Sequence, residues 1–463
     1  MSVKQIKVDV NEITVGMFVS GLDRPWSQTP FPLQGFYVRD IEEIKQLKTH
    51  CNHVFIDVVK GRGPVKTNLK TLSGDGEKPK FFSRSSKNAA VKVDVAPLKL
   101  RREAYLEKEP LEKEVKRAKQ LHQRVHRAVG EVMKQIDSGD LPVTETKRLA
   151  SDMVDSILRN PDAFSWLSRV RDMDEYTYSH SVRSSVWSIL FGRHAGLSKK
   201  DLDTLALGVL LKDIGKSKLD KGLVQKTSRT SLENQQYEKF VEIGAQILRE
   251  TPGIEPRVIS VVKTHCERLN GSGFPSHLRG DKIPLLGKIA GIVTFYDETT
   301  NPRGEKFPIS PSKAVAKLYE ARGSEFQEEL VVEFIRAIGL YPTGTLVELS
   351  TGEVGVVVEQ NFKRRLKPKI ILVLDSVKSP IRKPVILDLA EDERRKQALI
   401  DKGKVTSAEI EKIEIAQDLE PGSYDIDIAE IRDKHVFAGL ADFVEEKPKK
   451  GILSMLGFKR DWD

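Results

Sequence analysis

The stretch LLKDIGKSKL (residues 210–219) closes a run in which apolar residues recur at steps of three and four. This spacing is typical of a helix with one buried face. Asp213 falls on the apolar face, with Lys212 and Lys216 beside it. A carboxylate that is taken out of water needs a cation, a metal or hydrogen-bond donors around it. The stretch therefore predicts a packed helix that ends at a charged and partly buried cluster.

A second chemically informative stretch is THCERLNGSGFP (residues 264–275). His265 shares a helical face with Val258 and Val262, and Cys266 overlaps that face. An inward-facing imidazole and thiol beside a Gly-rich turn are consistent with half of a functional site. A structural core histidine and a small buried cysteine explain the same pattern equally well. Taken singly, these residues favour the structural interpretation.

Together, the segments resemble a known family. LLKDIGK resembles the LLHDIGK of HD-GYP domains, HCERLNGSGFP resembles HHERxDGSGYP, and FYDETTNPRGEK (residues 295–306) lies where the family has VYDALTxxRxYxK. The likeness covers about residues 150–340. HD-GYP domains are the subfamily of HD-superfamily phosphohydrolases that hydrolyse cyclic di-GMP. Residues 4–59 resemble the domain of unknown function that often precedes them in bacteria, through VGMFV, LDRPW and PLQGF.

The expected fold is multidomain and mainly α, with an all-α HD-type helical bundle as its core. Periodicity and composition add a small α+β N-terminal domain, rich in strand patterns, and a small β-rich C-terminal module that alternates apolar and polar residues. The predicted division is an N-terminal domain over 1–60, a flexible basic linker over 61–103, a helical HD-GYP-like domain with an N-terminal helical extension over 104–342, the β-rich module over 343–445 and a tail over 446–463. Within the helical part, loops are expected at NGSGFP and around 298–311.

Departures from the family pattern fall on the metal cage. The resemblance implies two or three Fe- or Mn-type cations held by His and Asp, which generate a hydroxide and neutralise the phosphate. Three expected ligands are kept, and four are replaced. The kept positions are His180, Asp213 and His265, and the replaced positions are Lys212, Phe240, Cys266 and Thr294.

Lys212 is the most damaging replacement, because a protonated ammonium repels a metal and has no lone pair to donate. Phe240 cannot coordinate, while Cys266 as a thiolate suits only a soft metal. A binuclear site is therefore not expected. The cofactor prediction is none, or one divalent transition metal at low occupancy on the three kept ligands. Alternatively, Lys212 itself supplies the positive charge near Asp213.

Residues that contact phosphate in the family are better kept. Lys216 is the Lys of DxGK, and Arg303 and Lys306 stand where the family's Arg and Lys clamp the dinucleotide phosphates. Three cations around one pocket suit a ligand with two phosphodiesters. An exposed basic loop is the alternative interpretation of Arg303 and Lys306. If the site were active, Asp213 and Lys216 would be its catalytic residues.

The GYP element persists as Gly273-Phe274-Pro275. Replacing Tyr by Phe removes one hydroxyl and keeps the ring. In the family this loop also contacts proteins, including diguanylate cyclase domains, so such domains are possible partners.

Three functions remain open at this point. The favoured one is a degenerate HD-GYP signalling protein that binds cyclic di-GMP or a related nucleotide without hydrolysing it. The second is an active phosphodiesterase, with products pGpG or GMP, that uses an unusual metal site. The third is an interaction scaffold without a ligand.

The composition and charge of the chain bear on three further classes of protein: nucleic-acid-binding, secreted and membrane-spanning proteins. The 463 residues carry a net charge of +9. Residues 61–103 hold eleven Lys or Arg against four Asp or Glu, so most of the excess lies on the expected linker and no nucleic-acid partner is predicted. Two cysteines exclude a disulfide-stapled secreted fold. No apolar run is long enough to cross a bilayer, and the cytoplasm is the expected location. The amphipathic segment 113–136 suggests a possible homodimer.

Overall fold

A computed structural model describes residues 5–24, 29, 31, 35–38, 41–57, 95, 104–105, 109–136, 141–168, 176–305, 309–362, 364–403, 405–406 and 410–437. Except for residue 95, the linker predicted over 61–103 lies outside these residues, as do Lys306 and the tail predicted over 446–463. The chain divides into two compact units, one within residues 1–89 plus 361–366 and the other within residues 90–360 plus 367–463. Each unit is described by itself.

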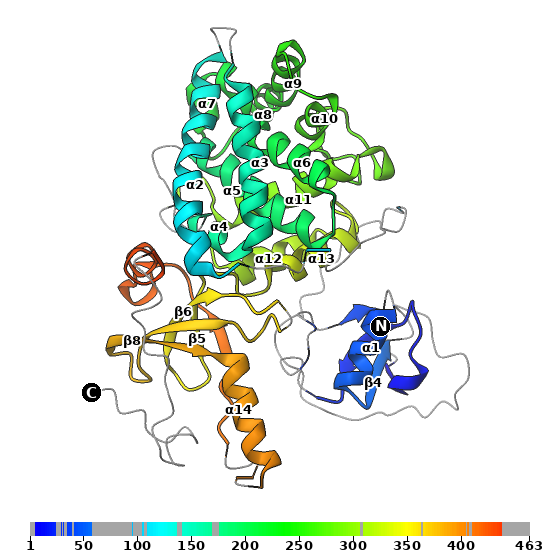
Figure 1. The fold of residues 1–463 in the computed structure, drawn as a ribbon. Helices are drawn as coiled ribbons and strands as arrows, with labels where there is room; N and C mark the ends of the chain where they lie inside the picture. The colour runs from blue at the N-terminus through cyan, green and yellow to red at the C-terminus, as the bar shows by residue number, and fades with distance from the viewer. Residues whose placement is uncertain are drawn as a thin grey trace. The chain divides into compact units, whose positions relative to one another are not determined.

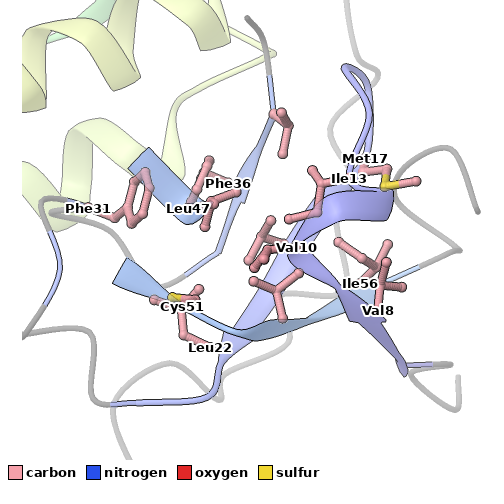
Figure 2. Close-up of a cluster of buried hydrophobic side chains, with 13 residues drawn as sticks. Val8, Val10, Ile13, Met17, Leu22, Phe31, Phe36, Leu47, Cys51 and Ile56 are labelled. Carbon is pink, nitrogen blue, oxygen red and sulfur yellow. The ribbon is translucent and has the colours of Figure 1, made fainter. Parts of the chain in front are cut away.

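The first unit is a four-stranded antiparallel sheet with one helix, α1 (Ile41–His50). Its strand order is β1 (Gln5–Asp9), β4 (His53–Asp57), β2 (Phe18–Leu22) and β3 (Phe36–Tyr37). Alternating apolar side chains from these strands meet Leu47 of the helix in one hydrophobic core, as Figure 2 shows. The small α+β domain expected at the N-terminus is thereby confirmed.

The second unit is built around α5 (Tyr176–His194), which runs through the middle of the helical bundle (Figure 1). This helix is buried from Ser179 to Gly192. A helix that is enclosed along this much of its length forms the centre of a bundle. The other helices of the bundle are α2 (Leu111–Lys134), α3 (Val143–Arg159), α4 (Pro161–Ser168), α6 (Lys199–Leu211), α7 (Lys221–Gln225), α8 (Ser231–Glu238), α9 (Phe240–Glu250), α10 (Pro256–Thr264), α11 (Leu285–Thr300), α12 (Pro311–Glu320) and α13 (Glu328–Ile338). The 3-10 turn η4 (Ile214–Lys218) directly follows the α6 region. This arrangement confirms the predicted helical core.

The long amphipathic helix α2 buries its apolar face inside the chain. Val115, Ala118, Val125, Val129 and Val132 are all buried, and the helix packs along α3, α4 and α5. The face that suggested a homodimer is therefore covered by the protein's own bundle.

A five-stranded antiparallel sheet follows the bundle, in the order β8 (Pro380–Asp388), β7 (Lys369–Leu374), β6 (Val354–Glu359), β5 (Leu346–Leu349) and β9 (Ile415–Asp418). The predicted hairpin is β5 paired with β6. Helices α14 (Leu389–Asp401) and α15 (Ile428–Ile431) accompany the sheet. Two hydrogen bonds join it to α4: Trp166 Nε1 donates to the Val358 carbonyl at 2.8 Å, and Thr343 Oγ1 donates to Asp162 at 2.9 Å.

One predicted boundary was wrong. The loop expected around 298–311 begins later, because α11 continues to Thr300. Of the last three residues of α11, Thr300 is buried and continues the buried face on which Tyr296 and Asp297 lie, whereas Glu298 is exposed. Among the described residues, no helix combines the length and the apolar character needed to traverse a bilayer.

Candidate functional site

Two ammonium groups hold the Asp213 carboxylate at the junction of α6 and η4. Lys212 Nζ lies on Asp213 Oδ2 with no exposure to solvent. Lys216 Nζ lies 2.6 Å from Oδ1 and is also buried. Burial alone would raise the pKa of Asp213, but the charges of Lys212 and Lys216 hold that pKa well below its ordinary value. The carboxylate is therefore ionised and electrically compensated by side chains of its own segment.

The local backbone explains this grouping. The α6 helix ends at Leu211, and the chain tightens into the 3-10 turn η4. Gly215 allows η4 to approach α9, since a Cβ atom there would come within 3.0 Å of the Phe240 carbonyl oxygen and the Gly244 nitrogen. The glycine of the motif is thus required by packing.

His180 of α5 reaches the same cluster from the centre of the bundle. Its Nδ1 is 2.7 Å from Asp297 Oδ2, and its Nε2 is 3.9 Å from Asp213 Oδ2. Arg183 donates to both oxygens of Asp297, with Nε 2.9 Å from Oδ1. Burial would raise the pKa of Asp297, but the Arg183 charge and the His180 hydrogen bond lower it. Because an ionised carboxylate only accepts hydrogen bonds, His180 carries its proton on Nδ1 and presents a lone pair at Nε2.

His265 presents a second lone pair. Its Nδ1 lies 2.7 Å from the Val262 carbonyl oxygen, which can only accept, so Nε2 is unprotonated in the neutral ring. Burial, assisted by the Lys212 charge, lowers the pKa of His265 to about 3. Burial and Lys212 likewise lower the pKa of His180. Both Nε2 atoms are buried and lack a hydrogen-bond partner among the described residues.

The other positions that the resemblance gives as replaced ligands carry an aromatic ring, a thiol and a hydroxyl. The Phe240 ring packs 5.9 Å from the His265 ring and 6.2 Å from Phe274. Lys216 Nζ lies 4.6 Å from the centre of the Phe240 ring, a cation–π contact. Burial raises the pKa of Cys266 to about 12, so its thiol stays protonated. The Thr294 hydroxyl is buried on α11.

These residues do not fit the two or three Fe- or Mn-type cations that the sequence resemblance implies. Of the ligands that the resemblance implies, two imidazole lone pairs and one carboxylate are present, but that carboxylate is bound by Lys212 and Lys216. Among the described residues, no three His, Cys, Asp or Glu side chains are grouped so that they could hold a metal ion. A dication brought beside two ammonium groups would be strongly repelled.

Arg303 lies beside the cluster, on the segment after α11. Its guanidinium stacks 4.2 Å above the Tyr176 ring, and its Nη2 donates to Thr177 Oγ1 at 3.1 Å. The Tyr176 ring in turn stacks 6.0 Å from His180. The structure therefore brings Arg303 to the neighbourhood of His180 and Asp213. Lys216, by contrast, is directed at Asp213, and Lys306 lies outside the described residues.

The Gly273–Pro275 loop is held by its own backbone and by Glu267. A Cβ atom at Gly273 would come within 3.0 Å of the Cys266 carbonyl oxygen. Glu267 accepts hydrogen bonds from the backbone nitrogens of Ser276 and Leu278, at 2.8 and 2.9 Å. The Phe274 ring consequently faces Phe240 at the edge of the cluster.

Further residues of the site were not found by sequence reasoning, among them Ser181, whose Oγ donates to Asp213 Oδ2 at 3.1 Å. Asp297, Arg183, Tyr176 and Glu298 all contact or face the cluster. Glu298 is half exposed, and its Oε1 lies 3.7 Å from His180 Nε2. The family motif has Ala at this position, so the acidic departure was visible in FYDETTNPRGEK. The pairing of Asp297 with His180 and Arg183 had no local signal, because it joins residues more than a hundred positions apart.

Comparison with known families and proteins gives matches over both units. The model of an HD domain matches residues 168–330, and the model of a domain of unknown function, DUF3391, matches residues 5–146. A cyclic di-GMP phosphodiesterase of Pseudomonas aeruginosa is 28% identical over 371 residues, which cover 79% of this chain and 84% of that protein. A 3'3'-cGAMP-specific phosphodiesterase 2 of Vibrio cholerae is 28% identical over 34% of this chain and 30% of that protein.

Other similarities cover different shares of the chain. A cyclic di-GMP phosphodiesterase of Thermotoga maritima is 27% identical over 38% of this chain, and the match spans 48% of that protein. Among solved structures, an HDG"Y"P protein of Bdellovibrio bacteriovorus is similar with a TM-score of 0.42 and 16% identity, over 71% of this chain and 98% of that one. The HD domain match, the DUF3391 match and the curated relatives named as cyclic di-GMP phosphodiesterases support the resemblance of this chain to HD-GYP proteins with an N-terminal DUF3391 domain.

Proposed function

We propose that this chain binds cyclic di-GMP or a closely related cyclic dinucleotide and signals through partner proteins without hydrolysing the ligand. The observation that carries the proposal is the fully buried Lys212 ammonium on Asp213, at a position where the family has a metal-binding His. Hydrolysis in the family depends on metal-activated hydroxide, and the Lys212 charge opposes the binding of that metal.

The case for a nucleotide rests on the relatives and on Arg303. The curated relatives are named as phosphodiesterases of cyclic di-GMP or 3'3'-cGAMP. A guanidinium that is already ordered by Tyr176 and Thr177 loses little conformational freedom when it binds a phosphodiester. We propose Arg303 and Lys306 as the principal phosphate contacts. Lys216 is proposed to act mainly through its charge, because its ammonium is occupied by Asp213.

The domain organisation, the location and the partner contact are also proposed. We infer that residues 1–60, 104–342 and 343–445 are the functional modules, with a linker over 61–103 and a tail over 446–463, and that the protein acts in the cytoplasm. The Gly273–Pro275 loop is proposed as the contact for partner domains of the diguanylate cyclase type. The half-buried Phe274 ring of this loop contacts Phe240, which would let a nucleotide bound at the cluster influence the contact with a partner.

The proposal is tested by titrating the chelator-treated protein with cyclic di-GMP and measuring the heat of binding by calorimetry. We expect binding without metal, and no pGpG or GMP after prolonged incubation with Fe²⁺ or Mn²⁺. The Arg303→Ala variant should bind at least about tenfold more weakly. The control is Arg257→Ala, which removes a half-exposed arginine paired with Asp201. Metal-dependent turnover would show an active phosphodiesterase, and no binding of any cyclic dinucleotide would leave an interaction scaffold.

A further inference from the structure

The helix α12 receives its N-terminal cap from the C-terminal sheet. The N-cap residue of α12, Ser310, makes no capping hydrogen bond with its own side chain. Asp418 of β9 accepts instead from the Ser312 backbone nitrogen at 3.1 Å and from Ser312 Oγ at 2.6 Å. Glu420 accepts from the Ser310 backbone nitrogen at 3.2 Å and pairs with Lys313. The two carboxylates satisfy N–H groups that a helix cannot satisfy internally.

Asp418 is the stronger of these two contacts. It lies in β9, where it pairs with Val347 of the buried strand β5. The next residue, Leu419, donates its backbone nitrogen to the Leu346 carbonyl at 2.9 Å. The Glu420–Lys313 pair is half exposed on both sides and contributes little on its own. The sheet therefore presents Asp418 to α12 from a fixed backbone.

The capped turn of α12 lies at the end of the segment that carries Arg303. The Ile309 backbone nitrogen donates to the Thr300 carbonyl at 2.7 Å, so residue 309 returns to the end of α11. At the other end, Asn301 Nδ2 donates to Asp297 Oδ1 at 3.2 Å, and Tyr176 donates to the Asn301 carbonyl at 2.7 Å. One end of the segment is thus fixed in the candidate site, and the other end is fixed where the sheet caps α12.

We propose that Asp418 is a positioning residue for Arg303, so that the C-terminal sheet controls how well the site is ordered to receive a phosphodiester. Removing the Asp418 contacts loosens the first turn of α12, so this end of the Arg303 segment is held less firmly, by the Ile309–Thr300 hydrogen bond and by Glu420. A ligand bound at Arg303 must in turn stabilise the contact between α12 and β9, because coupling of this kind is reciprocal. The ligand half of this proposal rests on the proposed function, whereas the structural half does not.

Hydrogen exchange followed by mass spectrometry tests the structural half on the full chain without ligand. In Asp418→Ala, the backbone amides of residues 309–316 should exchange about fivefold faster than in the wild type, as the loss of a helix cap predicts. The control is Glu391→Ala in α14, which removes ion pairs to Arg394 and Arg395 within the same C-terminal region. Equal exchange of residues 309–316 in wild type and Asp418→Ala would overturn the proposal.

Titration with cyclic di-GMP tests the ligand half. Asp418→Ala should weaken binding about threefold to tenfold, and Asp418→Asn, which keeps one acceptor oxygen, should recover part of the loss. The direction of the change in affinity is informative. If Asp418 acted only through its charge, its loss would strengthen the binding of an anionic ligand and not weaken it. In an Arg303→Ala background, Asp418→Ala should have no further effect.

The outcomes separate the two proposals. Undiminished binding by Asp418→Ala, or losses that simply add to those of Arg303→Ala, would overturn the role of Asp418 as a positioning residue. If the wild type binds no cyclic dinucleotide, the proposed function fails, and the exchange experiment alone decides whether the sheet orders the Arg303 segment.

Discussion

The Lys212 ammonium is completely buried, and its carboxylate partner Asp213 is its neighbour in the sequence. A buried ion pair contributes little net stability when both charges are present, but loss of one partner leaves an uncompensated charge. At the position where the sequence resemblance places a metal-binding His, the structure has an internal cation. Asp213 keeps its negative charge, and the cation that compensates it is now covalently part of the chain.

Replacing Lys212 by Met tests this role at the residue scale. Met has a similar length and no charge, so Asp213 would keep the Lys216 charge and the Ser181 hydrogen bond but lose its second ammonium. We expect the free energy of unfolding to fall by about 3–5 kcal/mol in urea. Lys200→Met, at an exposed position of α6, should stay within about 0.5 kcal/mol of the wild type. A Lys212→Met protein as stable as the control would show that the ammonium is not needed to compensate Asp213.

Glu298 gives a second prediction at this scale. Its carboxylate lies 3.7 Å from His180 Nε2 and is half exposed at the site, so it repels an incoming phosphodiester. Glu298→Gln should therefore tighten cyclic di-GMP binding by about threefold to tenfold, with a larger effect at low salt. The comparison is Glu242→Gln, an exposed position of α9, which should leave affinity unchanged. Weaker binding by Glu298→Gln would indicate that Glu298 contacts the ligand directly through a donor on the base.

At the scale of elements, the site depends on the close approach of η4 to α9. This approach places Lys216 over the Phe240 ring and leaves no room for a side chain at Gly215. Gly215→Ala should lower the thermal midpoint by several degrees or prevent folding, because backbone atoms on both sides would have to move. Gly222→Ala in the exposed helix α7 should be close to neutral, since its nearest neighbour is the movable Asp220 side chain. Equal midpoints for the two variants would contradict this packing.

The elements themselves were largely predictable. The buried face of α2 and the β5–β6 hairpin follow from periodicities that a single segment displays. The partners of Asp297 and Asp418 were not predictable, because each joins elements that are distant in the sequence. Lys216 was expected to face a phosphate because the sequence does not show which group its ammonium contacts. Its sequence position shows that a lysine is present, and only the fold shows that Asp213 occupies it.

At the scale of the whole molecule, the positions that the resemblance gives as replaced ligands lie on or next to four different helices. Lys212 ends α6, Phe240 begins α9, Cys266 follows α10, and Thr294 lies on α11. Whether these positions form one cage depends on how the bundle brings the four helices together. His180 and His265 still present unprotonated Nε2 atoms, each fixed by a hydrogen bond at Nδ1.

Restoring the four positions together tests whether the scaffold still defines the original site. The variant Lys212→His, Phe240→His, Cys266→His, Thr294→Asp should retain Fe or Mn through gel filtration, and added metal should raise its thermal midpoint. A matched triple variant that keeps Lys212 should retain no metal, because the ammonium still occupies Asp213. Elemental analysis of both proteins distinguishes the cases. Metal in the triple variant would show that Lys212 does not exclude it, whereas a folded quadruple variant without metal would show that these positions do not form one cage.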